Sequence, residues 1–407
     1  MWSLFAQRDR QGQHSGFLFC SRPHKARLYY KHHTLDLLTG RKVPGGAKDI
    51  LKDLHEVPLS ATFARPKVMH LAFEMGHFFT GLDELVPGHI PLAIEIEYLE
   101  ARNVELDELW EGKALSPQLR FLQVPSLDTY AHAFDRVQEE LLDGNCYQVN
   151  LTAPFYLTWD RRHRPSDFIR TLWSDPNRIG AYAHATWIST MGKLVLSNSP
   201  ECLVQRRMMD SGPELYSMPI KGTLPLNRSE DFKRTWHKMR SSLKEESELN
   251  MITDLVRNDL SKVARPLARV TAKHRPLQVP GLLHQYSIVS CPMTHEVTWG
   301  RILQTLFPGG SVTGAPKKRV MSLIHQLEPE PRGLYCGSTW LAYRDTLAAS
   351  INIRTAEIDM SAREMKYGAG GGVTLRSTVE SEFEEMMRKT ESFLSPFLKG
   401  KSQARSV

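Results

Sequence analysis

A lysine at the end of an expected strand is the residue in this chain whose chemistry is most informative. Lys221 lies in the sequence Pro-Ile-Lys-Gly-Thr at 219–223, directly after an apolar and polar run that predicts a strand. A lysine suits such a tight segment poorly unless its amine is used. Partial removal from water weakens the preference of an amine for its charged form and makes it a nucleophile. We therefore predict that Lys221 is an attacking amine.

Glu201 is the candidate for a general acid. It follows Asn-Ser-Pro at 198–200, at the end of another expected strand. A carboxyl group that is partly removed from water stays protonated to higher pH and can donate a proton to a leaving group. An ordinary solvated acid in a turn is the alternative interpretation.

Acidic side chains on two expected helices are candidate ligands for Mg²⁺. Glu248 shares a helical face with apolar residues, whereas Glu382 and Glu385 are about one turn apart on a later helix. Magnesium prefers a few carboxylates together with water and substrate oxygens. The sequence alone does not bring Glu248 to Glu385, and a solvated face with a pair between Glu385 and Lys389 is the alternative.

Two glycine-rich segments and one arginine could bind an anion. The run at 368–372 is either a flexible turn or a row of backbone N–H groups that holds a carboxylate. Arg354, in a strand among apolar residues, would supply a bidentate partner. The segment 307–317 resembles a phosphate loop, but Ala315 and Pro316 stand where such a loop requires Lys and Ser or Thr. That excludes nucleotide binding, although a helix N-terminus at this point still suits an anion.

The composition is that of an ordinary globular protein. The chain has 407 residues, of which 41% are hydrophobic and 24% charged, enough for one large domain or two closely packed ones. No apolar stretch approaches the roughly 20 residues that cross a bilayer, and the N-terminus has no signal-peptide pattern, so we expect a cytoplasmic protein. The net charge of +7 is diffuse, which argues against a nucleic-acid binder and suits a basic surface or an anionic metabolite.

The five cysteines exclude a zinc ribbon, because they are far apart and include no C-x-x-C pair. Their spacing also argues against a disulfide framework. We expect most of them to be small buried residues in a reducing compartment.

The expected elements mix strands and helices without regular alternation, which favours an α+β fold. Residues 1–110 are predicted as a divergent N-terminal region of irregular strands and loops, 111–125 as a linker, and 126–395 as the catalytic domain. Helices are expected at 127–142 with Ser126 as the cap, from a cap at 227–229 to about 263, at 316–327, and from Ser377 with a capping box to Glu380. Strands are expected at 90–98, 147–156, 181–188, 193–197, 340–343, 348–355 and 364–367.

Six motifs carry a resemblance to a known family. They are Gly-Asn-Cys-Tyr-Gln-Val-Asn-Leu at 144–151, Pro-Ile-Lys-Gly-Thr at 219–223, Met-Ile-Thr-Asp-Leu-Val-Arg-Asn-Asp at 251–259, Ser-Val-Thr-Gly-Ala-Pro-Lys at 311–317, Arg-Gly-Leu-Tyr-Cys-Gly at 332–337, and the stretch 368–385. Together they resemble the chorismate-utilising enzymes; the N-terminal region resembles them only around 67–100. The resemblance implies a fold like that of anthranilate synthase component I, with a mixed β-sandwich core flanked by helices.

Within that family the chain is most similar to aminodeoxychorismate synthase component I, the large subunit of para-aminobenzoate synthase. Isochorismate and salicylate synthases have a water-activating lysine where this chain has Gln148. Anthranilate synthases usually have alanine where this chain has Lys221, and their tryptophan-sensing Leu-Leu-Glu-Ser element is absent near this N-terminus.

The resemblance implies a transferase that converts chorismate and ammonia to 4-amino-4-deoxychorismate, on the route to 4-aminobenzoate and folate. Lys221 would attack C2 of chorismate while Glu201 protonates the departing C4 hydroxyl, and ammonia would then attack C4 and expel the lysine. By the same resemblance, Mg²⁺ would be held by Glu248 and Glu385 with Glu382 nearby. The substrate pocket would be lined by Gly222, Thr223, Ser311, Tyr335, Arg354, Gly370 and Lys389.

The sequence contains no Gly-x-Cys-x-Gly nucleophile elbow of a glutaminase, so a separate glutamine amidotransferase subunit would supply the ammonia. One departure from the family pattern is Ser-Ile-Val-Ser at 287–290, where the family usually has His-Leu-Val-Ser; His284 is close but not at the matching position. Because of this departure, a catalytically silent subunit of the same fold is an alternative interpretation. Anthranilate synthase component I is the main alternative activity.

Overall fold

The computed structural model describes residues 1–9, 12–112, 115–210, 212–226, 231–263, 267–279, 282–293 and 297–398, apart from the side chains of Thr223 and Lys244. Among the described residues, no helix is both long and apolar enough to span a bilayer. All five cysteines are buried free thiols, as the sequence predicts.

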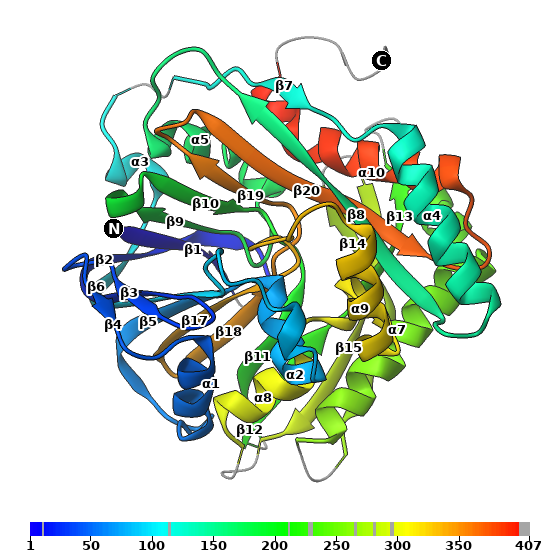
Figure 1. Ribbon diagram of the computed structural model, residues 1–407, viewed down its shortest axis with the longest axis horizontal. Coiled ribbons are helices and arrows are strands. Elements are labelled where there is room, and N and C mark those ends of the chain that lie inside the picture. The colour runs from blue at the N-terminus through cyan, green and yellow to red at the C-terminus, as the bar shows by residue number, and fades with distance from the viewer. Residues whose placement is uncertain are drawn as a thin grey trace.

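The strands form one continuous sheet that curls so that its two ends face each other across the molecule (Figure 1). Every strand pairing in the described part of the chain is antiparallel. In the order of hydrogen bonding the long path runs through β7 (Arg120–Gln123), β8 (Gln148–Thr158), β20 (Glu364–Val373), β19 (Thr355–Asp359), β10 (Lys193–Ser197), β9 (His184–Ile188), β1 (Trp2–Arg8), β2 (His14–Tyr29), β6 (Ala93–Val104), β5 (Phe63–Leu71), β17 (Ser338–Arg344), β18 (Thr346–Ile351), β11 (Cys202–Met209), β12 (Gly212–Met218) and β15 (Leu282–Pro292).

Two further strands and three short ones complete the sheet. β13 (Ile220–Pro225) continues the edge of β15 that β12 begins, and β14 (Arg269–Val279) pairs with the other edge. β3 (Thr34–Asp36) and β4 (Lys42–Val43) extend β2, and β16 (Gly314–Ala315) adds to β8. The predicted α+β class is therefore confirmed. At one end of the curled sheet lie β8 and β20, and at the other end lie β13 and β15.

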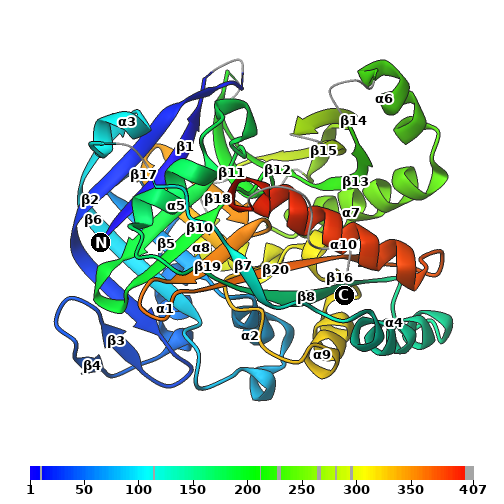
Figure 2. The ribbon, with the colours of Figure 1, turned by 90° about the horizontal axis from the view of Figure 1, so that it is seen from above.

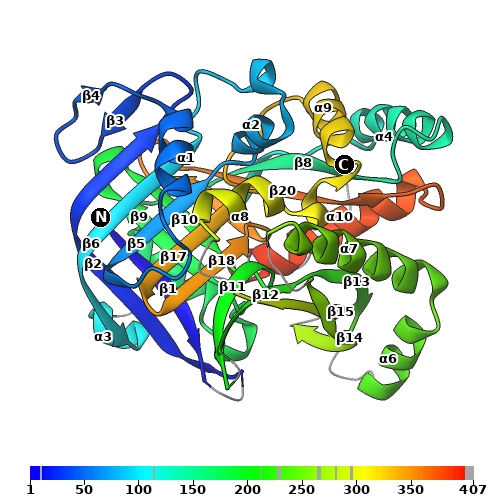
Figure 3. The ribbon, with the colours of Figure 1, turned by 90° about the horizontal axis from the view of Figure 1, so that it is seen from below.

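Helices cover the two facing ends of the sheet. α10 (Val379–Leu394) lies across β20 with α4 (Leu127–Leu142) beside it, and α6 (Phe232–Arg240) precedes α7 (Leu243–Ser261), which packs on β13 and β15 (Figures 2 and 3). α8 (Trp299–Leu306) packs on α1 (Ala47–His55). The remaining helices are α2 (His77–Thr80), α3 (Leu106–Leu109), α5 (Pro165–Leu172) and α9 (Lys317–Leu327).

The best-predicted helix is α4, which has the expected bounds because its cap is encoded locally. The Ser126 side chain accepts a hydrogen bond from the N–H of Thr129, and Asp143 ends the helix. The last helix begins one residue later than expected: Thr378 is its cap and accepts from the N–H of Ser381, so the predicted capping box from Ser377 is wrong.

The predicted single helix up to about residue 263 is wrong. The structure has two helices, with a break where Ser242 leaves the helical conformation and its side chain accepts a hydrogen bond from the N–H of Glu245. A serine at this position competes for backbone groups and so begins a new helix. Asp231 caps the first of the two helices. The predicted cap at 227–229 lies outside the described residues.

The glycine run 368–372 also differs from its expected turn, because β20 continues through it to Val373. Each residue of the run pairs with β8, from Gly368 opposite Pro154 to Gly372 opposite Asn150. The predicted strand at 364–367 is therefore only the first part of a longer one. The interpretation as a flexible turn is therefore wrong. That backbone N–H groups of the run hold a carboxylate stays a prediction, since β19 pairs only with the first part of β20.

The expected half-buried strand at 90–98 is present as β6, with one acid inside. Glu95 is 2% exposed and lies 2.6 Å from Lys67 Nζ and 2.8 Å from Lys25 Nζ. Burial acts to raise the pKa of Glu95, but these two charges outweigh it and hold that pKa at about 2. The alternation of residue types cannot distinguish a solvated acid from one that meets two lysines across the sheet.

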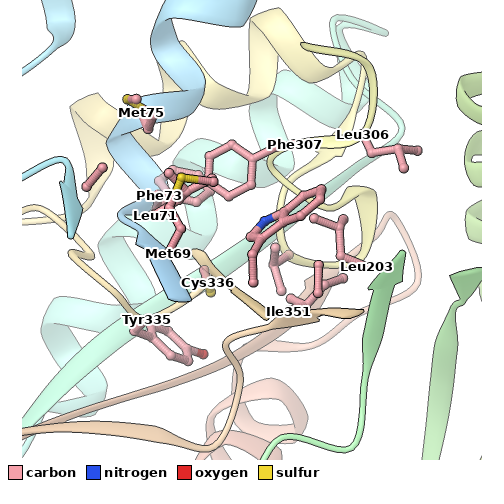
Figure 4. Packing of buried hydrophobic residues seen from close by; sticks show 14 of the residues in the cluster. Met69, Leu71, Phe73, Met75, Leu203, Leu306, Phe307, Tyr335, Cys336 and Ile351 are labelled. Carbon is pink, nitrogen blue, oxygen red and sulfur yellow. The ribbon is translucent and has the colours of Figure 1, made fainter. Parts of the chain in front are cut away.

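The hydrophobic core joins the two ends of the chain. Met69, Leu71 and Phe73 from β5 and the turn that follows it lie close to Phe307 and Cys336, which come from far along the chain (Figure 4). β5 pairs directly with β17, and β1 pairs with β9. The division at 1–110, 111–125 and 126–395 stays a prediction; β7 lies inside the segment expected to be a linker.

Candidate functional site

A cavity of about 960 Å³, counted with its open mouth, lies between α7, β13 and β15 on one side and β20 and α10 on the other. Its walls contain every predicted site residue but one. These are Glu201, Lys221, Gly222, Glu248, Ser311, Tyr335, Arg354, Gly370, Glu382, Glu385 and Lys389. Thr223 belongs to β13, opposite His284, and its side chain lies outside the described residues.

Lys221 is presented to this cavity by an irregularity in the sheet. The pairing of β13 with β15 shifts register between Lys221 and Thr223, and the intervening Gly222 has φ of +79°. The positive φ favours glycine there, and a Cβ would lie 2.7 Å from Oε2 of Glu245, so the end of that side chain would have to move. The shift breaks the strand alternation and leaves the half-buried Lys221 at the cavity wall.

The glycines of β20 give the lysine amine its space. A Cβ on Gly372 would lie 2.9 Å from Lys221 Nζ and 2.1 Å from Nε2 of Gln148. A Cβ on Gly368 would lie 2.2 Å from the ring of Tyr335. The glycines of the run therefore allow side chains that line the cavity to pack closely against β20, and the run is not an open loop.

Glu201 is 3% exposed, which fits a group that carries a proton. Burial raises its pKa to about 7, against the opposing effects of the Ser311 hydroxyl and the charge of Lys221. Its Oε1 atom has no hydrogen-bond partner among the described residues. A carboxyl group with its pKa raised in this way can carry a proton near neutral pH, as a general acid requires.

Arg354 is held at the cavity wall by a histidine. Its Nη2 atom donates to Nε2 of His284 at 2.9 Å, and Nδ1 of His284 donates to the carbonyl oxygen of Gly222 at 2.9 Å. Burial, with the charge of Arg354, lowers the pKa of His284 to about 3, so the ring is neutral and its tautomer is fixed by these two bonds.

The guanidinium of Arg354 is available for an anion. Within the described part of the chain it makes no ion pair, and burial lowers its pKa. Its backbone φ is +51°, a conformation rare for a residue with a side chain. A desolvated cation without a counter-charge beside an empty volume fits a carboxylate ligand.

Carboxylates from two helices line the cavity. Glu245 and Glu248 come from α7, and Glu382 and Glu385 from α10. Glu382 accepts from the Ser377 hydroxyl at 2.7 Å. Among the described residues, no group of three or more His, Cys, Asp or Glu is placed to hold a metal ion. The donors are the hard oxygens that Mg²⁺ takes, so their chemistry fits this ion only where water and substrate oxygens supply further ligands.

Lys389 connects the acidic helix to the glycine strand. Its Nζ lies 2.8 Å from Oε1 of Glu385 and donates to the carbonyl oxygen of Gly370 at 2.9 Å. The predicted pair between Glu385 and Lys389 is therefore present, but it lies at the cavity and not on a solvated face.

A family model described as chorismate binding enzyme matches residues 95–395. The chain belongs to this family. It is 33% identical to aminodeoxychorismate synthase component 1 of Salmonella typhimurium over 66% of this chain and 57% of the relative. It is 31% identical to the protein of that name from Escherichia coli over 74% of this chain and 66% of the relative. The chain thus spans less than two thirds of the length of these relatives.

Solved structures of an anthranilate synthase component I and of isochorismate synthases show the same fold. Anthranilate synthase component I of Streptococcus pneumoniae superposes with a TM-score of 0.74 at 19% identity, over 92% of this chain and 91% of that chain. The menaquinone-specific isochorismate synthase of Escherichia coli gives 0.69 at 15% identity, over 98% and 89%. The predicted anthranilate-synthase-component-I-like fold is confirmed.

Two residues of the candidate site were missed from sequence. His284 orients Arg354 from β15, although the sequence only marked it as near the unusual Ser287. Glu245 lies three residues before Glu248 and so on the same face of α7. This spacing in the sequence could have indicated that Glu245 belongs to the site. Ser287 itself is fully buried, and its hydroxyl has no partner among the described residues.

Proposed function

We propose that this protein is the chorismate-aminating component of an aminodeoxychorismate synthase. It would convert chorismate and ammonia to 4-amino-4-deoxychorismate, on the way to 4-aminobenzoate and folate. The relatives named above support the subfamily, and the family membership supports an enzyme that acts on chorismate. The observation that carries the proposal is the amine of Lys221 in one cavity with Glu201 and Arg354.

The reaction uses these groups in two displacements. The amine of Lys221 forms a bond to C2 of the ring, both ring double bonds shift by one position, and the C4–O bond breaks, with Glu201 giving the leaving hydroxyl its proton. Ammonia then forms a bond to C4, both double bonds shift back, and the bond between C2 and the lysine breaks. The carboxylate of Glu201 takes the extra proton from the new amino group, which restores both side chains.

The remaining wall residues bind and orient the substrate. Arg354 pairs with one carboxylate of chorismate, and Ser311, Tyr335 and the backbone of Gly370 shape the space around the ring. Glu248 and Glu385, with Glu382 nearby, would hold Mg²⁺. When bound, this ion would neutralise the second carboxylate of the substrate. Lys389 keeps Glu385 in place from the neighbouring turn of α10.

Ammonia would come from a glutamine amidotransferase subunit. The absence of glutamine-dependent product formation with every amidotransferase that co-purifies with the chain would count against this partner.

The proposal is tested by product analysis. Purified protein is incubated with chorismate, Mg²⁺ and an ammonium salt at alkaline pH, beside the Lys221→Ala variant and a control at an exposed strand lysine, Lys193→Ala. We expect 4-amino-4-deoxychorismate from the native protein and the control, little from Lys221→Ala, and a mass increase on Lys221 when the reaction is trapped without ammonia. Anthranilate with pyruvate would reassign the subfamily, full activity of Lys221→Ala would exclude the lysine as nucleophile, and intact chorismate throughout would indicate a silent subunit.

A further inference from the structure

A buried arginine lies next to the large cavity of the candidate site without lining it. Arg332 is 4% exposed and precedes Tyr335 by three residues. Its Nη1 atom donates to the carbonyl oxygen of Val312 at 2.7 Å, and its Nη2 atom donates to the carbonyl oxygen of Asn150 at 2.6 Å. Val312 and Asn150 both line the large cavity, and Val312 directly follows Ser311. Arg332 therefore connects two walls of the cavity from behind.

A carboxylate holds the other side of this guanidinium. Glu328, at the end of α9, accepts from Nε and Nη2 of Arg332 at 2.8 and 2.6 Å, and from the N–H and hydroxyl of Thr152 on β8 at 3.0 and 2.9 Å. The side chains of Arg332 and Glu328 are 2% and 6% exposed. A buried ion pair adds little net stability over apolar residues of similar volume, but it can fix one geometry. This pair joins β8, the 3₁₀ turn Gly310–Val312 and the loop of Arg332.

The loop of Arg332 is held by a segment from the first hundred residues of the chain. Glu74 is 5% exposed, and its two oxygens accept from the N–H of Arg332 at 2.7 Å and from the N–H of Gly333 at 3.2 Å. The N–H of Phe73 donates to the carbonyl oxygen of Gly333 at 2.8 Å, and the guanidinium carbon of Arg332 lies 4.4 Å from the centre of the Phe73 ring. Phe73 and Tyr335 lie in the same part of the core (Figure 4). These contacts fix the backbone just before Tyr335.

The ring of Tyr335 has a hollow behind it. This hollow of about 270 Å³, counted with its open mouth, is lined among others by Thr152, Glu328 and Arg332. Tyr335 and Gly368 line both the hollow and the large cavity, so the tyrosine separates the two. Because side chains do not fill the space behind it, the place of the ring depends on the backbone of its own loop.

We propose that Arg332, Glu328 and Glu74 are positioning residues that set Tyr335 and Ser311 at the spacing which chorismate requires. None of the three contacts the substrate, since their hydrogen bonds go to the backbone and to one another. The inference rests on the proposed function, because it takes chorismate as the ligand of the large cavity. Through Glu74, the first hundred residues of the chain take part in substrate binding.

The test weakens this cluster at Glu74, where the change in volume is small. Glu74→Gln replaces one acceptor oxygen with a donor, so one of the two backbone N–H groups loses its partner. The substrate then has to order the loop when it binds. An unmade hydrogen bond corresponds to about a 5- to 30-fold change in an equilibrium constant. We expect the Kd for chorismate, measured by calorimetry, and the KM to rise by that factor, with a smaller change in kcat.

Asp167→Asn is the matched control. Asp167 is 7% exposed, accepts from the N–H of Arg164 at 2.9 Å and of Leu115 at 3.2 Å, and lines neither the large cavity nor the hollow. This variant should lower the Tm without changing the Kd for chorismate. A Glu74→Gln protein that loses Tm as the control does but binds chorismate like the native protein overturns the inference.

A second variant keeps the test decisive if Glu74→Gln does not fold. Arg332→Lys retains a charge beside Glu328, but a single terminal nitrogen cannot also donate to the carbonyl oxygens of Val312 and Asn150 as the guanidinium does. It should weaken chorismate binding by a similar factor. Native affinity in a folded Arg332→Lys protein overturns the inference.

A double-mutant cycle with Tyr335→Phe distinguishes positioning from a general loosening of the fold. If Glu74 acts through Tyr335, the effect of Glu74→Gln on the Kd should be at least about threefold smaller once the tyrosine hydroxyl is absent. Equal effects in the two backgrounds overturn the inference. Native protein that binds chorismate but forms no 4-amino-4-deoxychorismate overturns the proposed function alone, whereas native protein that does not bind chorismate overturns both.

Discussion

Replacement of His284 by phenylalanine removes the two hydrogen bonds that connect Arg354 to β13. The ring volume is nearly kept, so the change is one of polarity. Arg354 loses its acceptor at 2.9 Å, and the carbonyl oxygen of Gly222 loses a donor at 2.9 Å. The guanidinium is then free to turn away from the cavity.

The size of the effect follows from the cost of an unmade hydrogen bond. A partly buried donor left without its acceptor costs about 1–2 kcal/mol, which corresponds to about a 5- to 30-fold change in an equilibrium constant. If Arg354 binds a carboxylate of chorismate, this loss appears in substrate binding. We expect the Kd for chorismate, measured by calorimetry, and the KM to rise by that factor, with a smaller change in kcat.

A matched control separates binding from stability. His184 is also buried, donates from Nδ1 to the carbonyl oxygen of Tyr182 at 3.1 Å, and lies outside the cavity. His184→Phe should lower the Tm without changing the Kd, and His284→Gln, which keeps an acceptor and donors, should recover part of the binding. A His284→Phe protein that loses stability as the control does but binds chorismate like the native protein would refute the positioning of Arg354 by His284.

Two further variants test the acid and the glycine strand. Glu201→Gln should lower kcat by about 10²- to 10⁴-fold. In the native protein, Glu201 keeps its proton up to about pH 7 when folded but only up to about pH 4.5 when unfolded, so the free energy of unfolding falls as pH rises through that range. Glu201→Gln has no such proton, and its free energy of unfolding should change less over the same range. Urea unfolding at several pH values checks this, and a parallel profile for both proteins would contradict it. Gly372→Ala places a Cβ against Lys221 and Gln148, and kcat should fall together with about 1–3 kcal/mol of stability. Gly88→Ala, with open space around it, is the control; equal kinetics in the two variants would exclude close packing at the lysine.

Local signals account for the elements that the sequence predicted well. Ser126 and its hydrogen bond to Thr129 define the start of α4 within a few residues, and Lys221 is conspicuous because of its own neighbours. The motif resemblance selected the site residues, and the structure places those residues, from widely separated segments of the chain, around one cavity. The metal ligands and the roles of these residues stay predictions.

Long-range geometry accounts for what was missed. The glycine run is a strand because β8 pairs with it residue by residue, and nothing within five glycine and alanine residues reports that partner. His284 and Arg354 are seventy positions apart and meet only because β15 and the segment between β18 and β19 line the same cavity. Glu95 is buried because two lysines from other strands meet it. Each of these facts belongs to a pair of segments and not to either one.

The order of strands in the sheet determines how this protein unfolds. β1 is inserted between β9 and β2, and β5 supplies the partner of β17, so strands from the first hundred residues are internal members of the sheet that also carries the cavity. Their removal would bare the hydrogen-bonding edges of β9 and β17 and the apolar side chains beneath them. The beginning and the end of the chain therefore melt in one cooperative step, and a fragment that starts at α4 would lack the partners it needs to fold.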